Sequence, residues 1–326
     1  MLSTTQEAKE YRKKFHEYYY GKILPILETF EETRKAKYFK YKIYLYSGVL
    51  SVICAVGFLI LAVFWASLAA NWTFGLTVAA ASLFLVGADT LGNAKKFKKS
   101  FEKDVKDTVI EVFLTFFGNF QWRQKGFLDE KEIKASKLVG IFNAWIPDDY
   151  FEGNFSETKF IISEMKLELR EKSNKQYVDI FNGIFIKLSS NKITTSHTII
   201  KEKFSLGSLL LPKMFLGLNK TELEDIEFNK MFDVYTDDEV EARYIITTTF
   251  IERFKHLKAM FNANEIRASF RGSSILIALS CKKDMLVLGD IRKPITEYQE
   301  IQTLFEEFLA VMSIVEVLNL DSKTGL

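Results

Sequence analysis

Residues 43–88 read IYLYSGVLSVICAVGFLILAVFWASLAANWTFGLTVAAASLFLVGA, and this stretch decides the fold. It holds 46 consecutive residues without a charge, between Lys42 and Asp89. A membrane-spanning helix needs about 20 apolar residues at a rise of about 1.5 Å each. The run is therefore long enough for two spans.

One natural break divides this run, at Ala70–Thr73. Asn71 interrupts the apolar pattern there, and Trp72 is a residue type that favours the membrane interface. We predict one helix over about residues 44–69 and a second over about residues 73–91. The alternative is a single long span followed by a buried helix.

Positive charges flank the run on both sides. Residues 34–42 hold five basic residues and no acid, residues 95–99 hold four lysines and no acid, and the connecting loop is uncharged. Positively charged flanks stay on the cytoplasmic side of a membrane. We therefore expect a multi-pass membrane protein with both termini in the cytoplasm and the lipid bilayer as a partner.

Small residues form a stripe where the two predicted helices would meet. Lipid supplies no hydrophobic force between helices, so their association depends on close approach of the backbones. We expect the packing residues to be Ala62, Ala66 and Ala70 in the first helix, and Gly75 and Ala79 in the second.

Helical patterns continue on both sides of the hairpin. The charged segment before it could touch anionic lipid or pack on the second flank. After it, apolar residues recur at steps of three and four from Phe97 to Phe116, which is typical of an amphipathic helix. The predicted organisation is a juxtamembrane helical segment at 1–42, a transmembrane hairpin at 43–92, a connecting helix at 93–128 and a cytoplasmic α+β domain at 129–326.

Alternating residues mark the strands of the last domain. Met165, Leu167 and Leu169 alternate with charged residues, which is the period of a half-buried strand. We predict one strand over 178–188 that continues through Asn182-Gly183, another over 192–201, and a hairpin that turns at Arg271-Gly272-Ser273.

Two long helices accompany these strands. The first is expected over about 236–261, with a capping box at Thr236–Glu239. The second is expected over about 296–318, with six apolar residues facing inward: Ile301, Leu304, Phe305, Phe308, Met312 and Val315. Strands and helices in this order predict an α+β fold with an antiparallel sheet.

Composition and the absence of known motifs argue against several classes of partner and enzyme. A net charge of +2 argues nothing for nucleic acid, and two cysteines, Cys54 and Cys281, indicate no disulfide framework. The sequence contains no phosphate-binding glycine loop, dinucleotide fingerprint, serine elbow or paired-cysteine motif. We therefore expect no cofactor, no metal and no nucleic-acid partner, and we name no catalytic residue. The missing motifs argue against an enzyme, although an enzyme of an unfamiliar class stays open.

Three polar groups have a structural and a functional interpretation. Asp148-Asp149 could bind a cation, but Pro-Asp-Asp is a common turn composition. The acidic residues between Asp237 and Glu241 could bind Ca²⁺, but a helix N-terminus attracts carboxylates without a metal. His197, beside three threonines, reads as a strand-surface residue rather than a catalytic base.

Five blocks of sequence carry a resemblance to a known family. They are Tyr150–Gly153, Ile162–Glu164, Phe181–Phe185, Phe228–Tyr235 and Glu241–Thr247. In order and spacing, over about residues 130–320, they resemble a bacterial family labelled domain of unknown function 3137, whose members commonly carry an N-terminal membrane hairpin. The resemblance implies a bacterial inner-membrane protein, and it brings no activity, cofactor or catalytic residue.

Three functional hypotheses remain. The favoured one is an interaction or scaffolding module at the cytoplasmic face of the bacterial inner membrane, with a protein partner that Glu164 or Arg243 would contact. The second is a membrane-associated enzyme with Glu164, Asp148, Asp149 or Arg243 in a cleft. The third is an oligomeric pore or transporter subunit, and a homo-oligomer stays open in each case.

Overall fold

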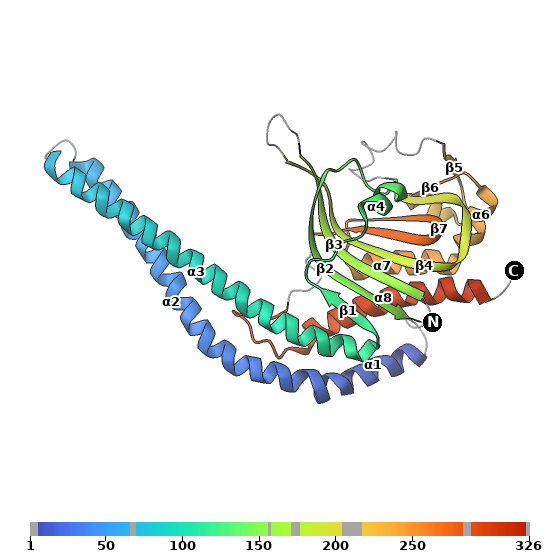
Figure 1. The fold of residues 1–326 in the computed structure, drawn as a ribbon, viewed down its shortest axis with the longest axis horizontal. Helices are drawn as coiled ribbons and strands as arrows, with labels where there is room; N and C mark the ends of the chain where they lie inside the picture. The colour runs from blue at the N-terminus through green and yellow to red at the C-terminus, as the bar shows by residue number, and fades with distance from the viewer. Residues whose placement is uncertain are drawn as a thin grey trace. The chain divides into compact units, whose positions relative to one another are not determined.

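The computed structural model describes residues 6–65, 70–155, 158–170, 177–203, 217–282 and 288–323. The chain forms two compact units, whose elements are labelled in Figure 1. The sheet unit comprises Met1–Glu17, Phe113–Leu286 and Gln299–Leu326, and the helical unit comprises Tyr18–Val112 and Val287–Tyr298.

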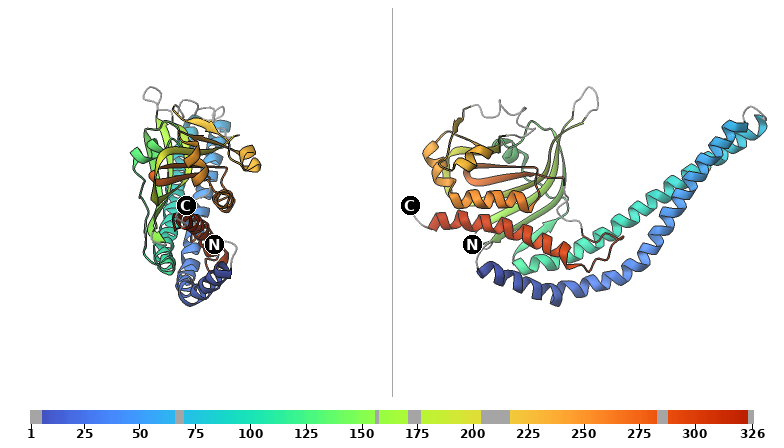
Figure 2. Two further views of the ribbon diagram at one scale, coloured as in Figure 1. Left: turned by 90° about the vertical axis from the view of Figure 1, so that its right-hand side faces the viewer. Right: turned by 180° about the vertical axis from the view of Figure 1, so that it is seen from behind.

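Long helices build the helical unit and continue into the sheet unit. Helix α1 (Gln6–Tyr18), the π-helical turn η1 (Tyr19–Ile23) and α2 (Leu24–Trp65) follow one another, and α3 (Ala70–Phe117) comes next. Within the described residues, two helices are long and apolar enough to cross a membrane, over Ala8–Trp65 and Trp72–Phe117. Figures 1 and 2 show α2 and α3 side by side.

Large apolar side chains project from these two helices. Phe64, Trp72 and Phe74 are each more than two-thirds exposed. In water such exposure would be costly, because each large apolar side chain gains about 1.5–3 kcal/mol on burial. The exposure therefore fits a surface that faces lipid.

A seam of small residues joins α2 to α3. A Cβ atom added to Gly48 would lie 2.7 Å from Oγ1 of Thr90, and one added to Gly87 would lie 2.8 Å from Cγ2 of Val52. The buried small residues recur at steps of seven, which keeps them on one face of each helix. We call these residues the small-residue seam: Gly48, Ala55 and Ala62 in α2, and Ala80, Gly87 and Ala94 in α3.

A segment late in the chain, residues 288–298, packs within the helical unit. Ile291 is fully buried, and its carbonyl accepts a hydrogen bond from Arg34 at 2.9 Å. Arg34 also pairs with Glu31 at 2.7 Å, and Glu31 accepts from the amide of Ile295 at 3.2 Å. No motif in the sequence marks this segment.

The sheet unit holds an antiparallel sheet, which confirms the predicted α+β class. Within the described residues its strands run in the order β1-β2-β3-β4-β6-β5, and β7 also pairs with β4. Their bounds are β1 (Phe120–Arg123), β2 (Ala144–Phe155), β3 (Thr158–Arg170), β4 (Tyr177–Glu202), β5 (Asn219–Thr221), β6 (Phe232–Thr236) and β7 (Glu265–Ser280).

Two strands differ from the sequence prediction. The strands predicted over 178–188 and 192–201 are parts of one 26-residue strand, β4. The hairpin predicted at Arg271–Ser273 is wrong, because β7 runs through that point and both of its halves pair with β4. Gly272 has a φ of +60°, which only bends the strand there. The prediction of an unbroken strand through Gly183 is confirmed.

Five further helices complete the sheet unit: α4 (Glu130–Ser136), α5 (Ile226–Met231), α6 (Glu239–Ile245), α7 (Thr248–Met260) and α8 (Tyr298–Lys323). The single helix predicted over 236–261 is two helices, because Thr247 caps a new one by accepting from the amide of Phe250 at 3.2 Å. Asp238, rather than Thr236, caps α6.

Both faces of the sheet are covered (Figures 1 and 2): α7 and α8 lie along one face and α4 lies on the other. The six predicted inward residues of α8 are all buried. Phe305 of α8 stacks on Phe15 of α1, with ring centroids 3.9 Å apart, and Phe308 packs edge-on against Phe113 of α3. Helix α1 and the end of α3 thus contribute to the core of the sheet unit.

Candidate functional site

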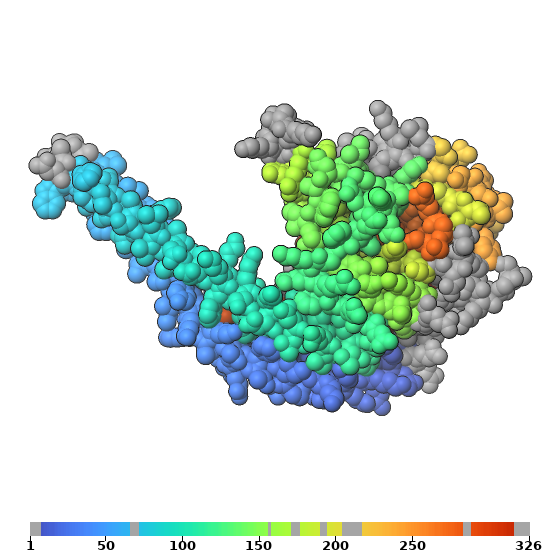
Figure 3. All heavy atoms as spheres, in the orientation of Figure 1, coloured from blue at the N-terminus to red at the C-terminus, as the bar shows by residue number. Residues whose placement is uncertain are grey.

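A pocket of about 980 Å³ opens on the α4 side of the sheet, within the sheet unit. Residues of α4, β4 and β7 line it, and in Figure 3 the orange atoms of β7 reach the surface beside the green atoms of the segment that carries α4. Its charged lining residues are Glu132, Lys134, Lys137, Lys187, Asp237 and Arg271. Four basic and two acidic residues make this lining formally positive when its histidine is neutral.

An irregular stretch of β4 shapes the pocket. Thr194 pairs with Gly272, and His197 pairs with Arg271. Between these two pairs β4 advances by three residues while β7 advances by one, which is a shift of register. Extra residues of this kind form a bulge, which bends a strand and re-aims its side chains. The bulge and the positive φ of Gly272 together bring His197 and Arg271 to the same edge of the pocket.

His197 is held on three sides. Its Nε2 lies 3.0 Å from Oγ of Ser269, its ring hydrogen-bonds the backbone of Ser136, and its own amide donates to Asp237 at 2.8 Å. Burial lowers the pKa of His197 below 6.5, and the nearby charges of Lys137 and Arg271 lower it further. The imidazole is therefore neutral at pH 7.

Nε2 of His197 and Oγ of Ser269 share one hydrogen bond. In a neutral imidazole one ring nitrogen donates and the other accepts, so the tautomer decides which of these two atoms is the donor. The side chain of Ser269 is only 2% exposed, so this contact is shielded from solvent.

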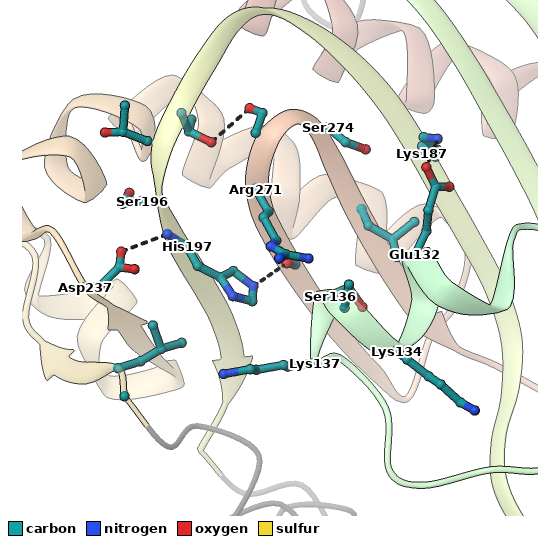
Figure 4. Close-up of a pocket in the computed structure, with 18 residues that line it drawn as sticks. Glu132, Lys134, Ser136, Lys137, Lys187, Ser196, His197, Asp237, Arg271 and Ser274 are labelled. Carbon is teal, nitrogen blue, oxygen red and sulfur yellow. Dashed lines mark hydrogen bonds and ion pairs between the residues drawn. The ribbon is translucent and has the colours of Figure 1, made fainter.

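Two of the four basic residues are neutralised by close acids. Lys187 pairs with Glu132 at 2.5 Å, and Lys134 pairs with Glu130 at 2.5 Å. Within the part of the chain that the structure describes, the exposed guanidinium of Arg271 makes no hydrogen bond or ion pair. Figure 4 shows Arg271 and Lys137 on either side of the His197 ring. The arrangement can hold an anion.

The residues guessed from the sequence as partner contacts lie elsewhere. Glu164 is half-buried in β3, and Arg243 is exposed on α6, where it lies 3.5 Å from Glu239. Neither lines the pocket. Their role in binding a partner stays a prediction.

The residues predicted to pack the two helices of the hairpin differ in how buried they are. Ala62 is buried and belongs to the small-residue seam, and Ala79 is half-buried. Gly75 is exposed, and a Cβ added there would meet nothing within 4 Å. Ala66 lies outside the described residues, as does the side chain of Ala70.

The acidic groups considered as cation sites have structural partners. Asp149 is fully buried and accepts from Nε1 of Trp122 at 2.9 Å. Asp238 caps α6, and Glu241 accepts from the amide of Ser196 at 2.8 Å, which holds the irregular stretch of β4. Within the described ranges, no three His, Cys, Asp or Glu residues are grouped so that they could hold a metal ion.

Sequence reasoning missed the pocket because its residues are distant in the chain. Lys137, His197 and Arg271 share no local motif, and only the pairing of β4 with β7 and the position of α4 bring them together. One signal was present: Gly272 lies inside a strand pattern, where an isolated glycine often marks a bulge.

Comparison with known proteins gives one match. Residues 179–320 match a family model described as Protein of unknown function (DUF3137). The match confirms the family resemblance over the three later sequence blocks, Phe181–Phe185, Phe228–Tyr235 and Glu241–Thr247. The matched range includes His197 and Arg271 but not Lys137. No curated protein and no solved structure matches the chain.

Proposed function

We propose that this chain, matched over residues 179–320 to a family of unknown function, is a membrane-anchored binding module. In this proposal α2 and α3 form a two-span anchor in the bacterial inner membrane. Both chain termini and the sheet unit lie on the cytoplasmic side, where the sheet unit binds a ligand or a protein partner.

Three features support the anchor. The candidate spans are long and apolar enough to cross a membrane, and their large side chains are exposed. The small-residue seam allows the backbones to approach closely, as helix pairs in lipid require. The basic residues at 34–42 and 95–99 favour the cytoplasmic side for both flanks.

One observation carries the binding role: the sheet unit contains an open pocket of about 980 Å³ with a positive, hydroxyl-rich lining. Binding pockets commonly measure about 300–1,000 Å³ and hold a few well-placed polar groups. The structure holds the lining in place through the bulge of β4 and its contacts with Asp237 and Glu241.

Membrane fractionation tests the anchor. We expect the full chain to stay in the membrane pellet after an alkaline wash and to be released only by detergent. A variant in which a short flexible linker replaces residues 44–91 should leave the pellet. Release of the full chain by the alkaline wash would contradict the anchor.

Photocrosslinking in intact cells tests the protein partner. A photoreactive phenylalanine analogue at Arg243, which is exposed on α6, should give a discrete adduct. The same analogue at Lys159, an exposed position of β3, is the matched control. The same adduct pattern at both positions would contradict a specific partner surface at α6.

A second candidate, an enzyme, rests on the contact between His197 and Ser269. His197 Nε2 lies 3.0 Å from Oγ of Ser269, and a histidine within hydrogen-bond reach of a serine hydroxyl is the arrangement that can activate a nucleophile. Ser269 is only 2% exposed, which limits the access of a substrate to its Oγ atom. The binding role therefore accounts better for the pocket.

A further inference from the structure

We propose that the edge of the pocket formed by Lys137, His197 and Arg271 binds the phosphate group of a small soluble phosphate monoester. The inference rests on the proposed binding role and adds the chemical class of the ligand. It concerns three residues from three separate elements: the C-terminal cap of α4, the bulge of β4 and the bend of β7.

The charge balance of the lining selects an anion. Glu132 pairs with Lys187 at 2.5 Å. Asp237 accepts from the amide of His197 at 2.8 Å and keeps its negative charge, which is one against the two positive charges of Lys137 and Arg271. Arg271 is left without a side-chain partner among the described residues, and its guanidinium offers donors whose planar geometry suits phosphate oxygens.

The fold fixes the backbone positions from which the two cationic side chains extend. Lys137 has a φ of +56° at the end of α4, and Gly272, next to Arg271, has a φ of +60°. The carbonyl of Gly272 accepts from the hydroxyl of Thr194 at 2.9 Å, which fixes the bend of β7 against β4. The cations therefore come from backbone positions that the fold holds in place rather than from freely moving loops.

The lining beyond this edge suits the rest of a phosphorylated metabolite. The pocket volume of about 980 Å³ far exceeds that of a single phosphate ion. The lining includes the hydroxyls of Thr195 and Ser274, which can donate to or accept from a polar ligand. A sugar or other polyol that carries one phosphate matches these groups better than an apolar ligand would.

His197 should report on occupancy. The charged groups that face it are Lys137 of α4 and Arg271 of β7, which lower its pKa, and Asp237 after β6, which raises it. A bound phosphate adds negative charge beside the ring and raises the pKa of His197. By linkage, binding of phosphate and protonation of the His197 ring favour each other.

Titration calorimetry tests the proposal on the full chain in a maltoside detergent, which carries no phosphate. The probes are inorganic phosphate and glycerol 3-phosphate, with acetate as the carboxylate control. We expect saturable heat with both phosphates and weaker or no heat with acetate. Arg271→Gln should weaken phosphate binding by about tenfold or more, since a charge-assisted hydrogen bond is lost.

Arg243→Gln is the matched control, because it removes the same charge from an exposed helix outside the pocket. It should leave the affinity unchanged. Equal weakening by Arg271→Gln and Arg243→Gln, or equal binding of acetate and phosphate, would overturn the proposal. A thermal unfolding curve of Arg271→Gln that overlays that of the parent chain excludes misfolding as the cause of a loss.

A second readout follows His197 directly. With ¹³C-labelled histidine, the titration curve of His197 should move to higher pH when phosphate is added, while that of His256, which does not line the pocket, stays in place. An unmoved His197 titration would also overturn the proposal. These outcomes are independent of membrane fractionation, so failure of the phosphate site and failure of the anchor can be told apart.

Discussion

Gly→Ala substitutions in α2 and α3 should show how much the small-residue seam contributes to the stability of the helix pair. Each substitution adds one methyl group and raises helix propensity, but only at the seam does the methyl group meet the other helix. In a helix, Gly→Ala gains about 1 kcal/mol when the methyl group meets nothing. Gly57 of α2 is such a position, because a Cβ added there has no neighbour within 4 Å. Gly57→Ala should therefore stabilise the helix pair by about 1 kcal/mol.

Gly48→Ala should have the opposite effect in the same helix. The added Cβ would lie 2.7 Å from Oγ1 of Thr90 and 2.8 Å from Cγ of Leu91, distances that force α2 and α3 apart. Overpacking of this kind costs about 1–3 kcal/mol, which offsets the gain in propensity. The two alanine variants should differ by about 1–3 kcal/mol, with Gly48→Ala the less stable.

Reversible unfolding of the full chain in mixed micelles measures this difference. Helix separation can be followed by energy transfer between a dye on α2 and a dye on α3, as the fraction of sodium dodecyl sulfate rises. Gly87→Ala and Gly92→Ala repeat the comparison in α3, where only Gly87 has close neighbours. Equal stability of the members of each pair would refute the seam.

Three further predictions concern the two units. Phe305→Ala should destabilise the sheet unit by about 3–5 kcal/mol in urea unfolding, because Phe305 is buried against α1. Phe127→Ala is the control and should cost much less, because the side chain of Phe127 is 53% exposed. Similar losses of stability in the two variants would contradict the packing of α1. Ionised Glu31 accepts a hydrogen bond from the amide of Ile295, and the hydrogen bond from Arg34 lowers the pKa of Glu31. Hydrogen-exchange protection of the Ile295 amide should therefore be complete above the ordinary pKa of 4.5 and be lost as the pH falls through the lowered value. Protection that does not change across this range would refute the contact. A fragment of residues 129–326, which the sequence delimits as a domain, lacks α1 and the end of α3. It should aggregate, as light scattering would show, because Phe15 of α1 and Phe113 of α3 pack on α8. A monomeric fragment that unfolds cooperatively would contradict this.

Regular features of the fold could be read from the sequence because they depend on neighbours in the chain. The uncharged run at 43–88 has the length of two helices whatever the rest of the chain does. The face of α8 follows from a period of three and four, and all six residues predicted to face inward are buried. The glycine at Gly183 was likewise read as part of a strand.

Features that depend on distant partners could not be read. The bend at Gly272 looks like a hairpin turn until the second half of β7 is seen to pair with β4. Thr247 looks like one more residue of a helical face, although its hydroxyl begins a new helix. The 288–298 segment has no periodicity of its own, and its place depends on Arg34 and Glu31, more than 250 residues earlier.

The candidate site could not be predicted from the sequence for the same reason: its residues are distant from one another in the chain. Lys137, His197 and Arg271 belong to separate parts of the chain, and each by itself is an ordinary surface residue. His197 was read as a strand-surface residue, and it does lie on a strand. Its burial, and the charges of Lys137 and Arg271 beside it, lower its pKa, and both depend on the fold.

Thiol labelling in intact cells tests the anchored topology most directly. In a chain with Cys54→Ser and Cys281→Ala, one cysteine is placed at Asn71, at the start of α3, or at Arg243, exposed on α6. With a membrane-impermeant maleimide, we predict that Asn71→Cys reacts in intact cells and that Arg243→Cys reacts only after the membrane is opened. Labelling of Arg243→Cys in intact cells, or of Asn71→Cys only after opening, would contradict an anchor that holds the sheet unit at the cytoplasmic face.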